Sequence, residues 1–228
     1  MDCRRDLALM YELLDGHFGA LHWWPAEGPF EVAVGAILTQ NTAWTNVEKA
    51  IAALKEKGLL TPEALSRIDT EQLAGVIRPA GYYNVKATRL QSFVRFFREG
   101  YGGDMERMAA ERLPSLREKL LAVRGIGPET ADSILLYACG KPIFVCDAYT
   151  RRILLRHGMI GEDADYRLIQ EMFMRHLPPD VALFNQFHAL IVNAGKNFCR
   201  TAPKCDPCPL RGLRAARGRR AKQRRDSR

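Results

Sequence analysis

One segment of the chain places an acidic residue at the end of an apolar stretch. Asp147 follows Ile143-Phe144-Val145-Cys146 and directly precedes a helix predicted to begin at Ala148. A carboxylate at this position can cap the helix by accepting backbone N–H bonds. It can also stabilise a cationic transition state or orient water at the rim of an apolar interface. The residues alone leave both roles open.

A glycine-containing turn lies just upstream. The segment Val123-Arg124-Gly125-Ile126-Gly127-Pro128 joins a helix that ends at Val123 to one that begins at Pro128. We expect a tight turn with positive φ at the glycines and exposed backbone N–H groups, which can hold one DNA phosphate without reading sequence. The alternative is a plain helix–helix turn.

The cysteines fall into two groups. The N-terminus has no apolar signal core, so a disulfide framework is not expected. Cys139 and Cys146 have apolar neighbours and are predicted to be small core residues. The spacing Cys199-x5-Cys205-x2-Cys208 is typical of a metal site. The alternative is a decayed site without metal.

Helical periodicity accounts for most of the elements that must position these groups. Apolar residues recur at helical spacing from Asp6 to Phe18 and from Asn84 to Arg98, and strand signals are weak. The stretch 30–39 is almost wholly apolar, and we interpret it as a buried helix rather than a strand. Thr61 and Pro62 predict a helix start. The sequence therefore predicts an all-α protein.

The positive charge belongs to the end of the chain. Residues 211–228 hold nine Arg or Lys and one Asp, which equals the net charge of +8 for the whole sequence. Residues 1–210 are therefore net neutral, so basicity alone does not establish DNA binding. The basic tail is expected either to bind nucleic acid electrostatically or to be a solvated, disordered terminus. No run long enough for a transmembrane helix occurs, and a cytosolic location is expected.

Together, the hairpin, the extended segment and Asp147 resemble the helix-hairpin-helix, Gly/Pro-rich loop and Asp signature of the endonuclease III-like DNA glycosylase superfamily. The resemblance covers most of residues 20–208. It implies two helical lobes, 23–140 and 1–22 with 141–210, with DNA and the flipped base between them. It also implies that Asp147 lies beside the flipped sugar and is catalytic.

One departure from the superfamily pattern concerns strand cleavage. Members that also cleave DNA carry a Lys in a pattern like Gly-x-Gly-x-Lys-Thr-Ala, and here that position is Glu129. A Lys amine is needed to attack the sugar C1′ and form a Schiff base. We therefore expect base excision without strand cleavage.

Two further segments, His22-Trp23-Trp24-Pro25 and Thr39-Gln40-Asn41-Thr42-Ala43-Trp44, resemble the 3-methyladenine glycosylase branch. The resemblance implies that Trp24 and Trp44 sandwich the flipped base, with a wall and pocket formed by Trp23, Pro25 and Lys196. The implied DNA contacts are Gln40, Gly125, Gly127 and Thr130, where Gln40 fills the gap left by the base. Paired Trp residues can instead fill a core, and Lys196 can be a solvated side chain.

The superfamily resemblance also implies an iron–sulfur cluster, expected as [4Fe–4S], held by Cys199, Cys205 and Cys208. The residue at the expected fourth position is Arg214, not Cys. Cys3 is a candidate fourth ligand, as are a non-cysteine ligand and no ligand.

The expected function is a monofunctional glycosylase for alkylated purines, a monomer acting on double-stranded DNA with a damaged base. Two alternatives remain. One is an endonuclease III-type enzyme for oxidised or mismatched bases, and the other is a non-catalytic helix-hairpin-helix DNA-binding module.

Overall fold

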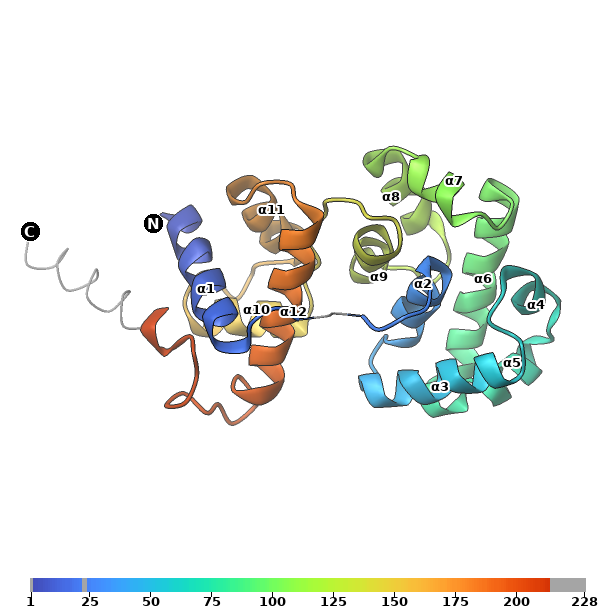
Figure 1. The fold of residues 1–228 in the computed structure, drawn as a ribbon, viewed down its shortest axis with the longest axis horizontal. Coiled ribbons are helices and arrows are strands. Elements are labelled where there is room, and N and C mark those ends of the chain that lie inside the picture. The colour runs from blue at the N-terminus through green and yellow to red at the C-terminus, as the bar shows by residue number, and fades with distance from the viewer. Residues whose placement is uncertain (1, 22–23, 214–228) are drawn as a thin grey trace, which may run out of the picture. The chain divides into compact units, whose positions relative to one another are not determined.

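The protein folds into two compact helical units. The computed structural model describes residues 2–21 and 24–213. One unit is Trp24–Lys141, and the other combines Met1–Trp23 with Pro142–Arg228. The described residues contain no β-strand, which confirms the predicted all-α class (Figure 1). Trp23 and the basic tail from residue 214 onward lie outside the described residues.

The helices of the Trp24–Lys141 unit follow each other closely in the chain. They are α2 (Pro29–Leu38), α3 (Trp44–Glu56), α4 (Pro62–Arg67), α5 (Thr70–Val76), α6 (Tyr83–Tyr101), α7 (Met105–Ala110), α8 (Leu113–Ala122) and α9 (Pro128–Ser133). A 3₁₀ turn, Arg78–Ala80, precedes α6, and a π-helical turn, Ile134–Ala138, continues α9. Figure 1 shows the long helix α6 in green beside α4 and α5, with which it packs.

Helix α2 lies in the core of this unit. Its residues 32–38 are all buried, and it packs against α3, α6, α9 and the π-helical turn. The expected buried helix over 30–39 is therefore confirmed, because an apolar helix contacted on all sides needs no polar face. Phe30 stacks on Phe97 of α6 at a centroid distance of 5.6 Å, and Phe97 stacks on Phe93 at 5.8 Å.

Polar N-caps set where several helices begin. Thr61 accepts from the N–H of Ala64 at 3.1 Å, with Pro62 in the first turn of α4, as predicted. Asp69 and Asp104 cap α5 and α7 in the same way. Each cap satisfies backbone donors that a helix leaves unpaired at its start.

A buried lysine joins three segments of the unit. The side chain of Lys86 in α6 is 1% exposed. Its ammonium donates to the carbonyl of Leu38 at the end of α2 (2.8 Å), to Thr42 Oγ1 (3.1 Å) and to the carbonyl of Ala80 (2.7 Å). Burial, and to a lesser extent the nearby Arg89, lowers the pKa of Lys86 to about 8.

Within the described residues, the second unit contains the long helices α1 (Cys3–Phe18), α10 (Ala148–Arg156), α11 (Tyr166–His176) and α12 (Val181–Asn197). The N-terminal helix α1 packs on α12, so the two ends of the described chain meet in one unit (Figure 1). The core contains a cluster of stacked and edge-to-face rings of Phe144, Phe173, Phe184 and Phe187.

A glycine allows α12 to approach α10 closely. A Cβ at Gly195 would overlap the ring of Tyr149, so only glycine leaves room for the ring there. The guanidinium of Arg152 lies 5.0 Å from the Tyr149 ring centroid and also donates to the carbonyl of Gly195 at 3.3 Å. No helix in the described part of the chain is long and apolar enough to cross a membrane.

We predict that Lys86 makes stability depend on pH between about 8 and 10.5. In this range the unfolded chain binds a proton at Lys86 that the folded chain does not, so the free energy of unfolding rises with pH. The shift from 10.5 to about 8 corresponds to a rise of roughly 3 kcal/mol. Urea unfolding at several pH values measures it.

Lys86→Met is the matched control, because its unfolding free energy should lack this rise. Burial raises the pKa of Cys139 to about 11, which lowers stability at alkaline pH in both proteins. The difference between the two proteins removes that effect. Parallel pH profiles for wild type and Lys86→Met would show that Lys86 does not titrate in this range.

Candidate functional site

The predicted turn between α8 and α9 is present. Gly125 has φ of +87°, whereas Gly127 has an extended backbone with φ of −92° and ψ of 178°. The expectation of positive φ therefore holds for Gly125 and is wrong for Gly127. Gly127 caps α9 instead, since its carbonyl accepts from the N–H of Ala131 at 2.9 Å.

A buried ion pair holds the two helices of this hairpin together. Arg117 of α8 donates to both carboxylate oxygens of Asp132 in α9, at 2.7 and 3.0 Å. Asp132 is fully buried, and such a bidentate pair fixes geometry as well as charge. Buried Ile126 anchors the turn between the helices.

Gln40 contacts the hairpin directly. Its Nε2 donates to the carbonyl of Gly125 at 3.1 Å and to Thr130 Oγ1 at 2.9 Å. Its Oε1 accepts from Arg89 Nη1. The structure thus brings together the predicted DNA contacts Gln40, Gly125 and Thr130, and adds Arg89, which the sequence did not single out.

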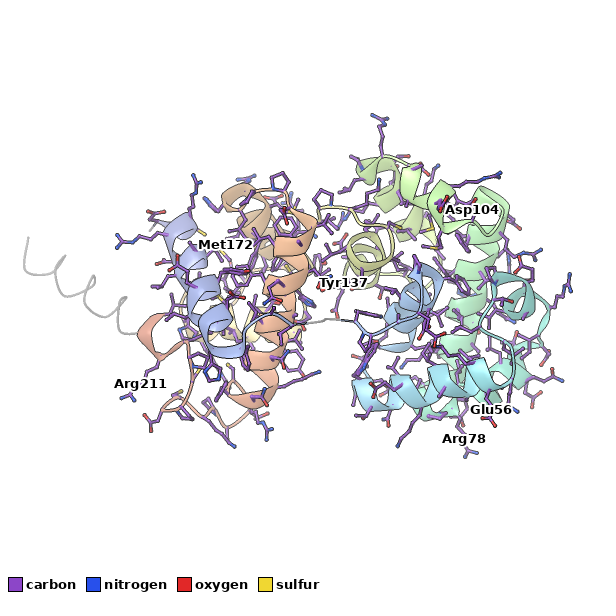
Figure 2. The ribbon with its side chains drawn as sticks, in the orientation of Figure 1. Glu56, Arg78, Asp104, Tyr137, Met172 and Arg211 are labelled. Carbon is purple, nitrogen blue, oxygen red and sulfur yellow. The ribbon has the colours of Figure 1, made fainter. Side chains whose placement is uncertain are left out.

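Three aromatic side chains cluster in the same unit. Trp24 packs edge-to-face on Trp44 at 5.2 Å and stacks on Tyr137 at 5.0 Å with an interplanar angle of 29°. Trp44 Nε1 also donates to Glu48 at 2.8 Å. Figure 2 shows Tyr137 extending from the helical turn that follows α9. The two indoles touch in this structure, so a base can enter between them only if one of them moves.

The same unit contains non-glycine residues whose backbone has positive φ. Among the described residues, the non-glycine positions with positive φ are Trp24 (+67°), Asn41 (+51°) and Tyr82 (+47°). Backbone strain of this kind concentrates at functional sites. Tyr82 is also 70% exposed, and an exposed ring on a rigid turn is able to stack on a base.

Asp147 lies in the other unit, and its two carboxylate oxygens have different neighbours. Oδ1 accepts from the backbone N–H of Thr150 at 2.7 Å and from its hydroxyl at 2.9 Å, so Asp147 is the N-cap of α10. Oδ2 lies 3.8 Å from Nε2 of His188. Burial lowers the pKa of His188 and outweighs the opposing effect of the nearby Asp147 charge, which favours the neutral imidazole.

Two predicted pocket residues are exposed. Pro25 follows Trp24 at the surface of its unit. Lys196 lies in the last turn of α12, where the sequence placed it, and its carbonyl accepts from Arg200 at 2.7 Å. The roles of Pro25 and Lys196 in a base pocket stay predictions.

The three clustered cysteines line one cavity of about 590 Å³. Arg156 Nη1 donates to Cys199 Sγ at 3.3 Å, and burial raises the pKa of Cys208. Within the described residues, no set of three His, Cys, Asp or Glu side chains is close enough to hold a metal ion as it stands. Three soft thiols suit an iron–sulfur cluster in kind. Cys3, the first residue of α1, is not among the residues that line the cavity.

The residues that sequence reasoning missed share one property. Lys86, Arg89, Tyr137 and His188 gain their importance from tertiary contacts with segments far away in the chain. In the structure, Tyr137 falls within a π-helical turn, an element frequent at functional sites.

Comparisons with known proteins agree with this arrangement. Residues 34–179 match the HhH-GPD superfamily base excision DNA repair protein family. A Methanocaldococcus jannaschii protein named "Putative DNA repair glycosylase MJ1434" is 47% identical over 89% of this chain and 92% of its own length. Endonuclease III of Thermotoga maritima is 31% identical over 80% of this chain and 81% of its own.

A solved structure shows that the similarity extends to the fold. The 3-methyladenine DNA glycosylase MagIII of H. pylori, bound to 1,N6-ethenoadenine, superposes with a TM-score of 0.73 at 30% identity. The match covers 86% of this chain and 98% of that one. Sequence and fold therefore agree that the chain belongs to the HhH-GPD superfamily of base excision DNA repair proteins and is a DNA glycosylase, an enzyme that hydrolyses N-glycosyl bonds.

Proposed function

We propose that this glycosylase removes alkylated purines of the 3-methyladenine type from double-stranded DNA, after flipping the base out of the helix. The observation that carries the proposal is the cluster of Trp24, Trp44 and Tyr137. Alkylation at purine N3 or N7 makes the base cationic, and a cation over an aromatic face is attracted by about 0.5–2 kcal/mol. The similarity to MagIII supports the same substrate class.

In this proposal the aromatic cluster opens to receive the base. Trp24 and Trp44 then face the base, and Pro25 forms part of the wall. Lys196 points away from the cationic base or has its charge masked, since a free ammonium would repel it. The stacking itself adds roughly 1–3 kcal/mol for any base. Selectivity therefore comes from the positive charge of the alkylated base and from its weaker C1′–N glycosidic bond.

Asp147 is proposed to act on the sugar. The C1′–N bond breaks, its electron pair neutralises the cationic base, and the sugar becomes an oxocarbenium ion. The negative charge of the Asp147 carboxylate stabilises that cation, with Oδ1 held by Thr150 and with Oδ2 beside His188, whose pKa burial lowers. Water then forms the new bond to C1′ and loses a proton to Asp147 or to solvent.

Strand cleavage is not part of the proposed reaction. Glu129 lies in the first turn of α9 and is exposed, and a carboxylate cannot form a Schiff base with C1′. The enzyme therefore releases the base and leaves an abasic site. Gly125, Gly127 and Thr130 are proposed to hold a phosphate, with Gln40 at the same DNA surface.

The cavity lined by Cys199, Cys205 and Cys208 is proposed to hold the iron–sulfur cluster. Three thiolates supply soft ligands. Arg156 and Lys204 line the cavity with positive charge that suits an anionic cluster, while Arg211 pairs with Asp206 at 3.7 Å in the same lining. The cluster would tie the segment after α12 to the rest of its unit.

A second candidate substrate class follows from the similarity to endonuclease III. An oxidised base would enter the same pocket but would lack the positive charge. A panel of alkylated and oxidised duplexes separates the two candidates in one assay.

We predict that the wild-type enzyme releases 3-methyladenine from alkylated duplex DNA and that Asp147→Asn reduces this rate by about 10²-fold or more. Asn still caps α10, so the fold and DNA binding should persist. Single-turnover base release measures the effect.

The matched control is Asp165→Asn, which changes the N-cap of α11 in the same way. This variant should retain the wild-type rate. Full activity in a folded Asp147→Asn variant would refute the role of Asp147, and a wild-type enzyme that releases only oxidised bases would refute the substrate class.

Borohydride trapping should give no covalent adduct between the wild-type enzyme and a duplex with an abasic site. Glu129→Lys supplies the missing amine, and we expect an adduct with this variant. A strong adduct with the wild-type protein would show that another lysine acts as nucleophile.

The cluster proposal predicts that anaerobically purified protein contains iron and absorbs visible light. Cys205→Ser should remove most of the iron because it removes one ligand, whereas Cys139→Ser, which changes a buried core thiol, should retain it. Iron-free, colourless wild-type protein would contradict the proposal.

A further inference from the structure

The hydrogen bonds of Gln40 in the DNA-free protein point to a role in addition to filling a gap in DNA. A glutamine amide has two N–H donors and one carbonyl oxygen. Here both donors go to the hairpin, at Gly125 O and Thr130 Oγ1, and the oxygen accepts from Arg89. Gln40 therefore bridges α6 and the hairpin.

Arg89 also contacts the hairpin through its aliphatic stem. A Cβ at Gly125 would overlap Cγ and Cδ of Arg89, so the stem lies directly on the glycine. The guanidinium then reaches Gln40 over this contact. A hydrogen bond from a charged donor is stronger than a neutral one.

We infer that Arg89 and Gln40 are positioning residues that together brace the Gly125–Gly127 turn for phosphate binding. Gln40 fixes the carbonyl of Gly125, and Arg89 fixes Gln40 while its stem fixes the Cα of Gly125. The turn then presents its N–H groups in one orientation and loses little conformational freedom when DNA binds. The inference rests on the proposed phosphate contact of this turn.

A brace and a gap-filling role differ in which DNA they affect. A brace acts on every duplex, because every duplex has phosphates. A gap-filling side chain acts only where a base has left the helix. A direct Arg89–phosphate contact is a third case, and it alone changes the salt dependence of binding, by about 0.9 in the log–log slope.

The experiment is a double-mutant cycle with Gln40→Met and Arg89→Met, which keep the side-chain stems. Affinity is measured for an undamaged duplex and for the same duplex with a tetrahydrofuran abasic-site analogue. Arg98→Met is the control, because Arg98 lies on the same helix and donates to Ser66 at 2.6 Å, away from the hairpin. Melting temperatures establish that each variant is folded.

We expect each single variant to bind both duplexes about tenfold more weakly, and the double variant to bind about tenfold rather than hundredfold more weakly. The salt slope should not change, and Arg98→Met should bind like the wild type. Three results would each overturn the inference. They are losses of affinity that multiply in the double variant, a loss confined to the abasic-site duplex, and a salt slope lower by about 0.9 for Arg89→Met.

Amide hydrogen exchange without DNA tests the brace independently of the proposed function. Both single variants should speed exchange at Ile126 and Ala131, whose N–H groups donate to Val123 and Gly127 in the hairpin, relative to wild type and to Arg98→Met. Unchanged exchange would overturn the inference. A coupled cycle in an enzyme that releases no alkylated purine would instead refute only the substrate proposal.

Discussion

The short turn between α2 and α3 is held by two cations from one face of α6. Lys86 and Arg89 are three residues apart, so both side chains lie on the same side of the helix. Lys86 binds the last carbonyl of α2 and the hydroxyl of Thr42, and Arg89 binds Gln40. The turn contains few apolar groups, so these charged contacts, rather than burial, give it a single conformation.

The conformation of this turn also determines where Trp44 lies in the aromatic cluster and where Gln40 meets the hairpin. Trp44 is the first residue of α3, and the position of its ring beside Trp24 follows from where the turn ends. The same turn presents Gln40 to the hairpin. An ammonium at the C-terminal end of α2 also meets the partial negative charge of the helix, which offsets part of the cost of burying Lys86. Burying the Lys86 ammonium therefore costs free energy, but its hydrogen bonds order the turn that carries Gln40 and leads to Trp44.

The sequence was informative wherever local rules decide the outcome. Thr61 and Asp147 begin helices because a side-chain oxygen next to unpaired N–H groups caps a helix in almost any context. The apolar stretch that became α2 was identifiable by composition. The prediction of positive φ at Gly127 was wrong because α9 begins at Pro128. Gly127 is therefore the N-cap of α9 and has an extended backbone. Arg89 and His188 had no local signal, since a charged residue on a helix surface and an imidazole in an apolar run become significant only through distant partners.

Asp147 shows why helix capping and catalysis are compatible in one carboxylate. The cap uses Oδ1, which faces the first turn of α10, and two donors from Thr150 fix the rotation of the group. Rotation fixed in this way also fixes Oδ2. A protonated His188 at 3.8 Å would form an ion pair and weaken the field at a developing oxocarbenium ion. Burial of His188 opposes this because it outweighs the effect of the Asp147 charge and favours the neutral imidazole, so the packing around His188 supports the negative charge that the proposed chemistry requires.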